Sequence, residues 1–206
     1  MDVVDANIGT LVNRMKQAGI YSSTLLIICA KHGQAPIDPT KLRKIDPQTL
    51  INATSVSIDY LTTDDIGLVW LTTPTIENIN QAKSDLLAAK DIAGISNVYA
   101  GPEVWQHGFG NPLLDSRVPD LIIVVNEGVI YTSPTAAKVM EHGEINPDDV
   151  STAIFVHNPA IVAKTIGERV YSRQIAVTAL EALGAPVAQL DGAQADGTVV
   201  LPGLNF

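Results

Sequence analysis

Three of the four histidines in this 206-residue chain stand directly before a glycine: His32, His107 and His142. A glycine in that position permits a sharp turn and a close backbone approach, which suits a histidine that projects from a loop toward a ligand. The pair also fits a surface or capping histidine. Position in the sequence separates the three, because His32 follows an apolar run and His142 precedes another. We interpret His107 and His157 as structural or surface residues.

The elements that must position these histidines begin with a helix and a strand. Residues 5–19 have the apolar spacing of one amphipathic helix, with Asp5 as its N-cap and Gly19 at its end. The uncharged run 25–30 is typical of a parallel strand that is buried on both faces. Within that strand Cys29 is expected to be a buried structural thiol. A helix followed by such a strand favours an α/β fold.

The loop 31–39 contains a glycine and two prolines, which stop regular structure. It places Lys31 and His32 just beyond the carboxyl end of the predicted strand, where open α/β sheets bind their ligands. His142 precedes another strand, so we predict that both histidines face one end of the same sheet. Asp120 is interpreted as a turn-capping residue in preference to a support for the site. Asp148 and Asp149 are interpreted as turn caps in preference to metal ligands in a new arrangement.

The rest of the chain predicts further strands and helices. They are a β-hairpin that turns at 62–65, a helix over 76–87, a hairpin of 121–125 with 129–131, a strand at 153–156, and a helix from Ser172 that ends at Gly184. No linker or repeat interrupts this order, so residues 1–206 are expected to form a single domain.

The composition excludes several classes of protein. A hydrophobic fraction of 46% is enough for a sizeable core and excludes a disordered chain. The net charge of −9 makes nucleic acid polymers and anionic membranes poor partners. Small phosphorylated substrates remain, because a metal ion can supply the positive charge. We expect no signal peptide and no membrane span in this chain, which leaves a secreted or periplasmic parent protein open.

Several segments, taken in order along almost the whole chain, resemble the type I phosphodiesterase/nucleotide pyrophosphatase branch of the alkaline phosphatase superfamily. The segments are residues 30–39 around Lys31-His32-Gly33, 117–121 with Arg-Val-Pro-Asp-Leu, 128–132, 141–144 with Glu-His-Gly-Glu, 174–176, 180–184 and 200–204. Taken together they are more specific than either histidine-glycine pair. The resemblance implies the C-terminal part of an α/β/α sandwich with a mostly parallel central sheet.

The resemblance also implies a metal-dependent hydrolase, usually with two zinc ions. In this family a threonine or serine attacks phosphorus, and the metals stabilise the attacking and leaving oxygens. His32 matches the histidine of the family's Asp-His-Gly metal motif, and His142 matches a later histidine ligand of the other metal. By this resemblance both histidines are metal ligands in a complete active site.

This chain departs from the family pattern in two ways. Lys31 stands where the family has a metal-binding aspartate, and a protonated ammonium cannot ligate a cation. Lys31 either contacts the substrate phosphate or is a solvated loop lysine. The family's N-terminal half, with the nucleophile and the remaining metal ligands, has no match, so no catalytic residue is assigned. A catalytic zinc generally needs three protein ligands, and the isolated chain is expected to lack a competent site.

Three functional hypotheses follow. The first is the C-terminal portion of a phosphodiesterase that acts on small phosphate esters, inactive alone and with an exposed sheet edge through which it self-associates. The second is a non-catalytic α/β protein that binds a metal, an anion or a partner and unfolds cooperatively as it stands. The third is hydrolysis of phosphomonoesters or phosphonates on the same scaffold.

Overall fold

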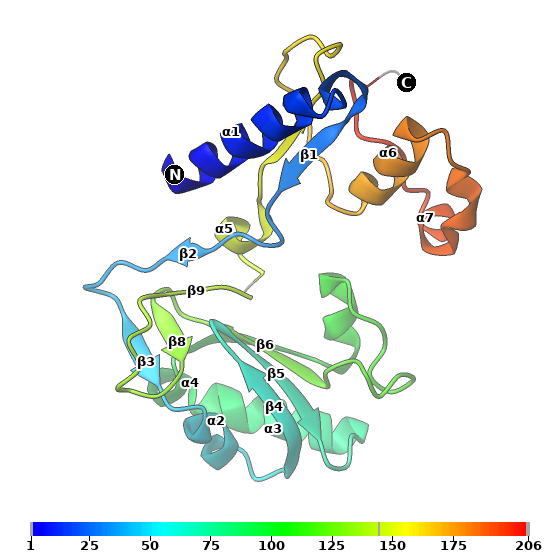
Figure 1. Cartoon of the computed structure of the whole chain (residues 1–206). Coiled ribbons are helices and arrows are strands. Elements are labelled where there is room, and N and C mark those ends of the chain that lie inside the picture. Colours follow the sequence, from blue (N-terminus) through cyan, green and yellow to red (C-terminus); the bar gives the residue numbers. More distant parts are fainter. Residues whose placement is uncertain (1, 144, 205–206) are drawn as a thin grey trace. The chain divides into compact units, whose positions relative to one another are not determined.

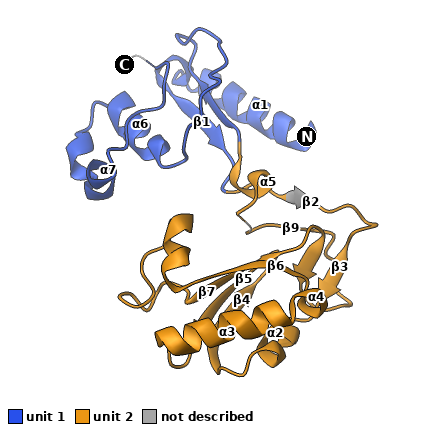
Figure 2. Cartoon of the chain, turned by 180° about the vertical axis from the view of Figure 1, so that it is seen from behind, with its two compact units in different colours: residues 1–31, 153–206 blue, residues 32–152 orange. Residues whose placement is uncertain are grey.

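The computed structural model describes residues 2–143 and 145–204, with only the backbone of Ala35 and Pro36. The chain divides into two compact units, which Figure 2 shows in different colours. Unit 1 comprises Met1–Lys31 and Ala153–Phe206, and unit 2 comprises His32–Thr152. No helix in the described part of the chain is long and apolar enough to cross a membrane.

Unit 1 is built around one two-stranded ladder. Its elements are α1 (Asp2–Gln17), the 3-10 helix η1 (Tyr21–Ser23), β1 (Leu26–Cys29), β10 (Ile154–His157), α6 (Gln174–Ala182), η3 (Val187–Gln189) and α7 (Asp191–Ala195). β1 and β10 pair antiparallel, with Leu26 opposite His157 and Cys29 opposite Ile154. Asn158 supports this ladder, because its side-chain amide donates to the carbonyl oxygens of Ser22 and Thr24.

Unit 2 contains most of the regular structure (Figure 1). Its strands are β2 (Ala35–Pro36), β3 (Arg43–Ile45), β4 (Ile58–Thr63), β5 (Ile66–Leu71), β6 (Ile95–Ala100), β7 (Leu121–Val125), β8 (Val129–Tyr131) and β9 (Met140–Glu141). Its helices are α2 (Gln48–Ala53), α3 (Ile76–Ala88), α4 (Lys90–Ala93), η2 (Gly101–His107) and α5 (Pro147–Val150).

The main sheet of unit 2 has the order β4-β5-β7-β6, and all its neighbours are antiparallel. β5 and β7 lie at its centre, and their sequences are almost wholly apolar because both faces are covered. α3 begins at an N-cap, where the hydroxyl oxygen of Thr75 accepts from the backbone N–H of Asn78. It buries Ile79, Ala82 and Leu86, which join the main core cluster of the unit.

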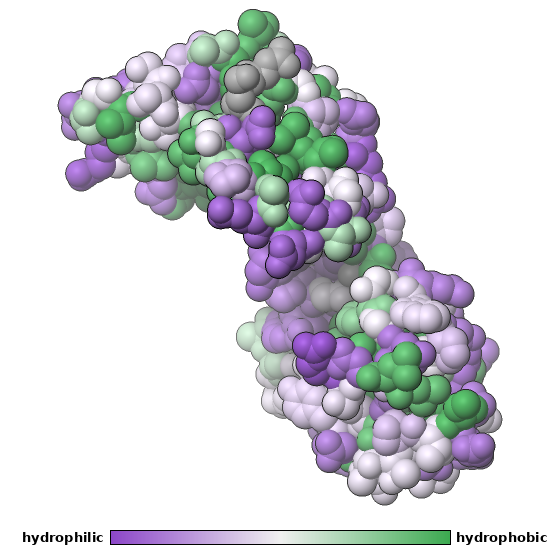
Figure 3. All heavy atoms as spheres, turned by 90° about the vertical axis from the view of Figure 1, so that its right-hand side faces the viewer, coloured by the Kyte–Doolittle hydropathy of each residue, from purple (hydrophilic) through white to green (hydrophobic). Residues whose placement is uncertain are grey.

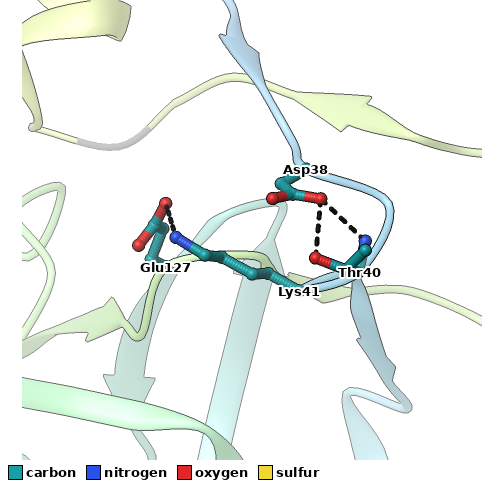
Figure 4. Close-up of polar contacts among 4 residues, drawn as sticks. All are labelled: Asp38, Thr40, Lys41 and Glu127. Atoms are coloured by element: carbon teal, nitrogen blue, oxygen red, sulfur yellow. Dashed lines mark hydrogen bonds and ion pairs between the residues drawn. The ribbon is translucent and has the colours of Figure 1, made fainter.

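The turn that leads into β3 is held by side-chain contacts (Figure 4). Asp38 Oδ1 accepts hydrogen bonds from the backbone N–H and the hydroxyl of Thr40, both 2.8 Å long, and these bonds lower the pKa of Asp38. Lys41 Nζ forms an ion pair of 2.8 Å with Glu127 Oε1, from the turn before β8. These contacts join the approaches to β3 and β8, which pair parallel.

Most of the predicted elements are confirmed. The hairpin is β4 and β5, the helix over 76–87 is α3, and the strands at 121–125 and 153–156 correspond to β7 and β10. The last helix is α6, and Gly184 follows it with a φ of +64°. The mixed α/β class also holds. The first helix, however, begins at Asp2, so Asp5 lies inside its first turn.

Two predictions about pairing are wrong. Residues 121–125 pair with β5 and β6, whereas residues 129–131 pair with β3. The expected mostly parallel sheet is likewise not what the described strands form, since β3–β8 is the parallel pair among them. The reason is that an apolar run indicates a strand but contains no information on which distant strand becomes its neighbour.

The environment of β1 also differs from the prediction. Its residues are half-buried or exposed rather than buried on both faces. Cys29 is an exposed free thiol rather than a buried one. An apolar strand becomes buried only if other layers cover it, and β1 has one neighbouring strand in the described part of the chain.

Candidate functional site

His32 and His142 stack face to face in unit 2. Their ring centroids are 3.7 Å apart, and their planes are inclined by 22°. β2 follows His32 and β9 precedes His142, and these strands pair antiparallel with Ala35 opposite Glu141. The ladder therefore brings together the two histidines that the sequence analysis selected.

Gly33 explains why a glycine must follow His32. Its N–H donates to the carbonyl oxygen of Asp149 at 2.6 Å, and a Cβ at this position would lie 1.8 Å from the carbonyl oxygen of Asp148. Any side chain would force the loop away from α5. The imidazole of His32 lies with Nδ1 2.6 Å from the carbonyl oxygen of Gly33. Because a carbonyl only accepts, Nδ1 carries the proton, and in the neutral ring Nε2 has a free lone pair.

Gly143 is required for a different reason. Its φ of +124° lies in a region that side chains rarely adopt. A Cβ here would lie 3.4 Å from Ile66 Cγ2 and 3.6 Å from Asp65 Oδ1. The backbone after His142 therefore passes close to the turn between β4 and β5. Both glycines thus fix backbone paths that place the two imidazoles.

The other two histidines make contacts that fit structural roles. The ring of His107 packs on Tyr99 with centroids 4.0 Å apart, and Gly108 ends η2 with a φ of +81°. His157 Nε2 is 2.6 Å from the hydroxyl of Tyr21, within unit 1.

A buried carboxylate lies immediately before His142. Glu141 is 6% exposed, and Lys138 Nζ bonds to its Oε1 and lies 3.5 Å from Asp64 Oδ1. Burial raises the pKa of Glu141, the neighbouring Asp64 carboxylate raises it further, and the Lys138 ammonium opposes the shift. Lys138 therefore partly neutralises an acidic cluster beside the histidine pair.

The sequence model of one family, type I phosphodiesterase / nucleotide pyrophosphatase, matches residues 2–147. The chain belongs to this family. Its match includes the whole of unit 2 up to the start of α5, with both His32 and His142. No curated protein sequence matches the chain significantly.

Solved structures of family members share the fold. Human ectonucleotide pyrophosphatase/phosphodiesterase 5 superposes with a TM-score of 0.58 at 16% identity, over 98% of this chain and 48% of that one. The murine protein, as an inactive variant in complex with AMP, superposes with a TM-score of 0.62 at 16% identity, over 89% of this chain and 47% of that one. Another structure of the murine protein superposes with a TM-score of 0.53 at 18% identity, over 77% of this chain and 40% of that one. This phosphodiesterase-family chain therefore spans at most about half the length of these structures, and its α/β fold is part of an alkaline-phosphatase-like fold.

The histidine pair does not by itself fit a complete metal centre. A metal ion lies in the plane of a ligating imidazole, about 2.1 Å from the nitrogen. The two imidazole rings are stacked 3.7 Å apart and inclined by 22°, so their planes meet only much farther from the rings than a metal–nitrogen bond reaches. One ion therefore cannot bind both histidines. Among residues 2–143 and 145–204, no three histidine, cysteine or acidic side chains form a group that could hold a metal. Glu144, next to the second histidine motif, lies outside the described residues.

Lys31 directly precedes His32 in the sequence, and Asp149 contacts the His32 loop. Lys31 is an exposed residue of unit 1, which leaves both interpretations of it open. Asp149, predicted as a capping residue, is 3% exposed, and its Oδ2 accepts from the amide of Asn146 at 2.9 Å. The cap of α5 is Asn146 itself, whose Oδ1 accepts from the backbone N–H groups of Asp148 and Asp149. Asp149 instead anchors the His32 loop through its carbonyl.

Proposed function

We propose that residues 1–206 are the C-terminal portion of a single alkaline-phosphatase-like domain. In its complete form this domain is a metal-dependent phosphodiesterase or nucleotide pyrophosphatase. The observation that carries the proposal is the stacked pair of His32 and His142, each held in place by a glycine that its backbone path requires. Family membership and the half-length overlap with solved family members support it.

The substrate in this proposal is a small phosphate ester. One structural neighbour is in complex with AMP, which is a nucleotide of that class. A chain with a net charge of −9 repels phosphate at long range, so positive charge at the site must come from metal ions or from a placed cation. We assign His32 and His142 as ligands of separate divalent ions, with zinc as the preferred ion, and Lys31 as a contact to the substrate phosphate.

The isolated chain is proposed to be inactive. A catalytic zinc generally requires three protein ligands, and among residues 2–143 and 145–204 neither His32 nor His142 belongs to a group of three that could hold a metal. No hydroxyl nucleophile is assigned in this chain. The remaining ligands and the nucleophile belong to the part of the domain that the chain does not include. The ladder of unit 1 fits this proposal, because β1 is only partly buried and has one neighbouring strand among the described residues. We propose that the isolated chain self-associates through this ladder.

A second candidate is a non-catalytic metal- or anion-binding protein on the same scaffold. The observation that favours it is the donor set itself, which offers two histidines and no described third ligand. This candidate predicts a monomer with one cooperative unfolding transition.

The test is hydrolysis of bis-p-nitrophenyl phosphate by the full chain, with and without zinc or manganese, beside the double variant His32→Ala and His142→Ala. We expect no turnover above the double variant. Metal-dependent turnover that the double variant abolishes would contradict the proposed inactivity and show that this chain supplies its own nucleophile. A monomeric chain that unfolds in one step would favour the non-catalytic candidate.

A further inference from the structure

The ladder of unit 1 has an open edge along β1. β1 pairs with β10 on one side, and no strand pairs with its other side in the part of the chain that the structure describes. An isolated pair of strands is marginally stable in water, and three or more strands are usually needed. The backbone groups along such an edge are a template for a further strand.

The two edges of the main sheet in unit 2 carry features that discourage pairing. The outer strands of the main sheet in unit 2, β4 and β6, both have irregular register, at Ile58/Tyr60 and at Ile95/Asn97. β4 also contains Asp59. Bulges and charges of this kind are common protection against edge-to-edge association.

β1 has none of this protection. Residues 25–30 contain no charge and no proline, and the register of β1 with β10 is regular. Beside the strand, a cavity of about 710 Å³ in unit 1 is lined by apolar residues such as Leu25, Ile27 and Leu183 and by polar residues such as Asn158 and Lys164. Figure 3 shows hydrophobic side chains, in green, on one face of the surface. In unit 1, Val162 is 82% exposed and Leu183 is 79% exposed.

We propose that the outer edge of β1 pairs antiparallel with β1 of a second copy of this chain. The product is a four-stranded sheet in the order β10-β1-β1-β10 with a two-fold axis between the copies. This inference deepens the self-association stated under the proposed function by naming its surface and its partner. It does not depend on catalysis.

The sequence of β1 is compatible with itself in this arrangement. A two-fold antiparallel pair sets one residue opposite its own copy, and the natural centre is Ile27. Leu26 then lies opposite Ile28 of the second copy, and Leu25 lies opposite Cys29. Lys31 lies beyond the end of β1, so no like charges meet across the paired strands.

The first test is sedimentation velocity of the full chain from about 1 to 100 µM under reducing conditions, which prevent a disulfide through the exposed Cys29. The substitution Cys29→Lys adds a charge at an exposed position of the edge and is expected to raise the dimer Kd about tenfold or more. Cys29→Ser is the matched control and retains the dimer. A monomer at every concentration overturns the proposal, as does an equal Kd for the two variants.

The second test is hydrogen exchange of the wild-type chain and remains informative if the lysine variant does not fold. Exchange of the amides in Leu26–Cys29 is expected to slow as the chain concentration rises, whereas exchange in β4 stays constant. A dimer without this effect has its interface elsewhere and overturns the proposal. Failure here leaves the phosphodiester assay untouched, so the two proposals can fail separately.

Discussion

The two units of this protein differ in how completely they bury their apolar residues. Unit 2 encloses a contiguous core in which Leu50, Leu86 and Ile123 are fully buried. In unit 1 the described hydrophobic residues that are buried are Met15, Val177 and Leu201, at 8%, 3% and 4% exposed, while many others stay exposed. Both units contain apolar strands and amphipathic helices, so the difference lies in the layers that cover them. In unit 2, other segments of the same chain cover the apolar residues, whereas in unit 1 many described apolar side chains are uncovered.

A matched pair of leucine truncations gives the largest expected contrast. Leu86 of α3 is 0% exposed and Leu183 at the end of α6 is 79% exposed. Leu86→Ala should lower the free energy of unfolding by about 3 kcal/mol, because it leaves a cavity in a closed core. Leu183→Ala should change it by less than about 0.5 kcal/mol. Urea unfolding followed by tryptophan fluorescence and by circular dichroism measures both effects.

The fluorescence in that experiment reports on unit 2, since Trp70 and Trp105 both belong to it. A cost for Leu183→Ala that approaches the cost for Leu86→Ala would show that the open face of unit 1 is covered in solution. The comparison between the units would then no longer hold.

Two glycines provide the next contrast. Gly128 has a φ of +87°, and a Cβ there would lie 2.4 Å from the carbonyl oxygen of Lys41. Gly184 has a φ of +64° with nothing within 4 Å. Gly128→Ala should therefore cost about 2 kcal/mol or more, because strain and a clash add together, whereas Gly184→Ala should cost about 1 kcal/mol from strain alone. Thermal unfolding of both variants measures the difference, and equal costs would contradict the close approach of the two turns in unit 2.

A buried carboxylate in unit 2 predicts a pH-dependent effect. Asp120 is 3% exposed, its Oδ2 accepts from the backbone N–H of Leu71, and burial raises its pKa. The folded chain therefore holds this proton to higher pH than the unfolded chain, so stability contributed below about pH 4 is lost as the pH rises through the folded pKa. The substitution Asp120→Asn keeps a side-chain oxygen that can accept from the Leu71 N–H, and it has no carboxyl proton to lose, so the variant does not lose stability in this way as the pH rises.

The stability of Asp120→Asn relative to wild type should thus increase between about pH 3 and pH 7. Urea unfolding at several pH values measures the difference between the two proteins. A difference that stays constant or falls with pH would show that burial does not govern this carboxyl group.

The smallest effect is expected at the surface of unit 2. Lys41→Met removes the ion pair with Glu127, in which both side chains are largely exposed. Exposed pairs gain little because water and salt screen them. We expect no measurable shift of the unfolding midpoint. A clear loss would show that the turn before β3 depends on this pair and not on the core beneath it.

Local patterns were sufficient for most individual elements and for part of the site. The spacing of apolar residues predicted α3, the β4–β5 hairpin and β7, because periodicity and turn residues act within a few positions. The glycines after His32 and His142 and their places beside apolar runs also singled out the two histidines. Their metal-binding roles came from the resemblance to the family and remain proposals.

What the sequence by itself determined about this protein is therefore its class, its family and the residues worth testing. Only the tertiary structure decided that β8 pairs with β3, that Cys29 is exposed, and that the two imidazoles stack on the β2–β9 ladder. Each of these depends on which distant segment lies alongside. A strand exposes the same hydrogen-bonding groups whatever its neighbour, and an apolar side chain is buried only when another layer covers it.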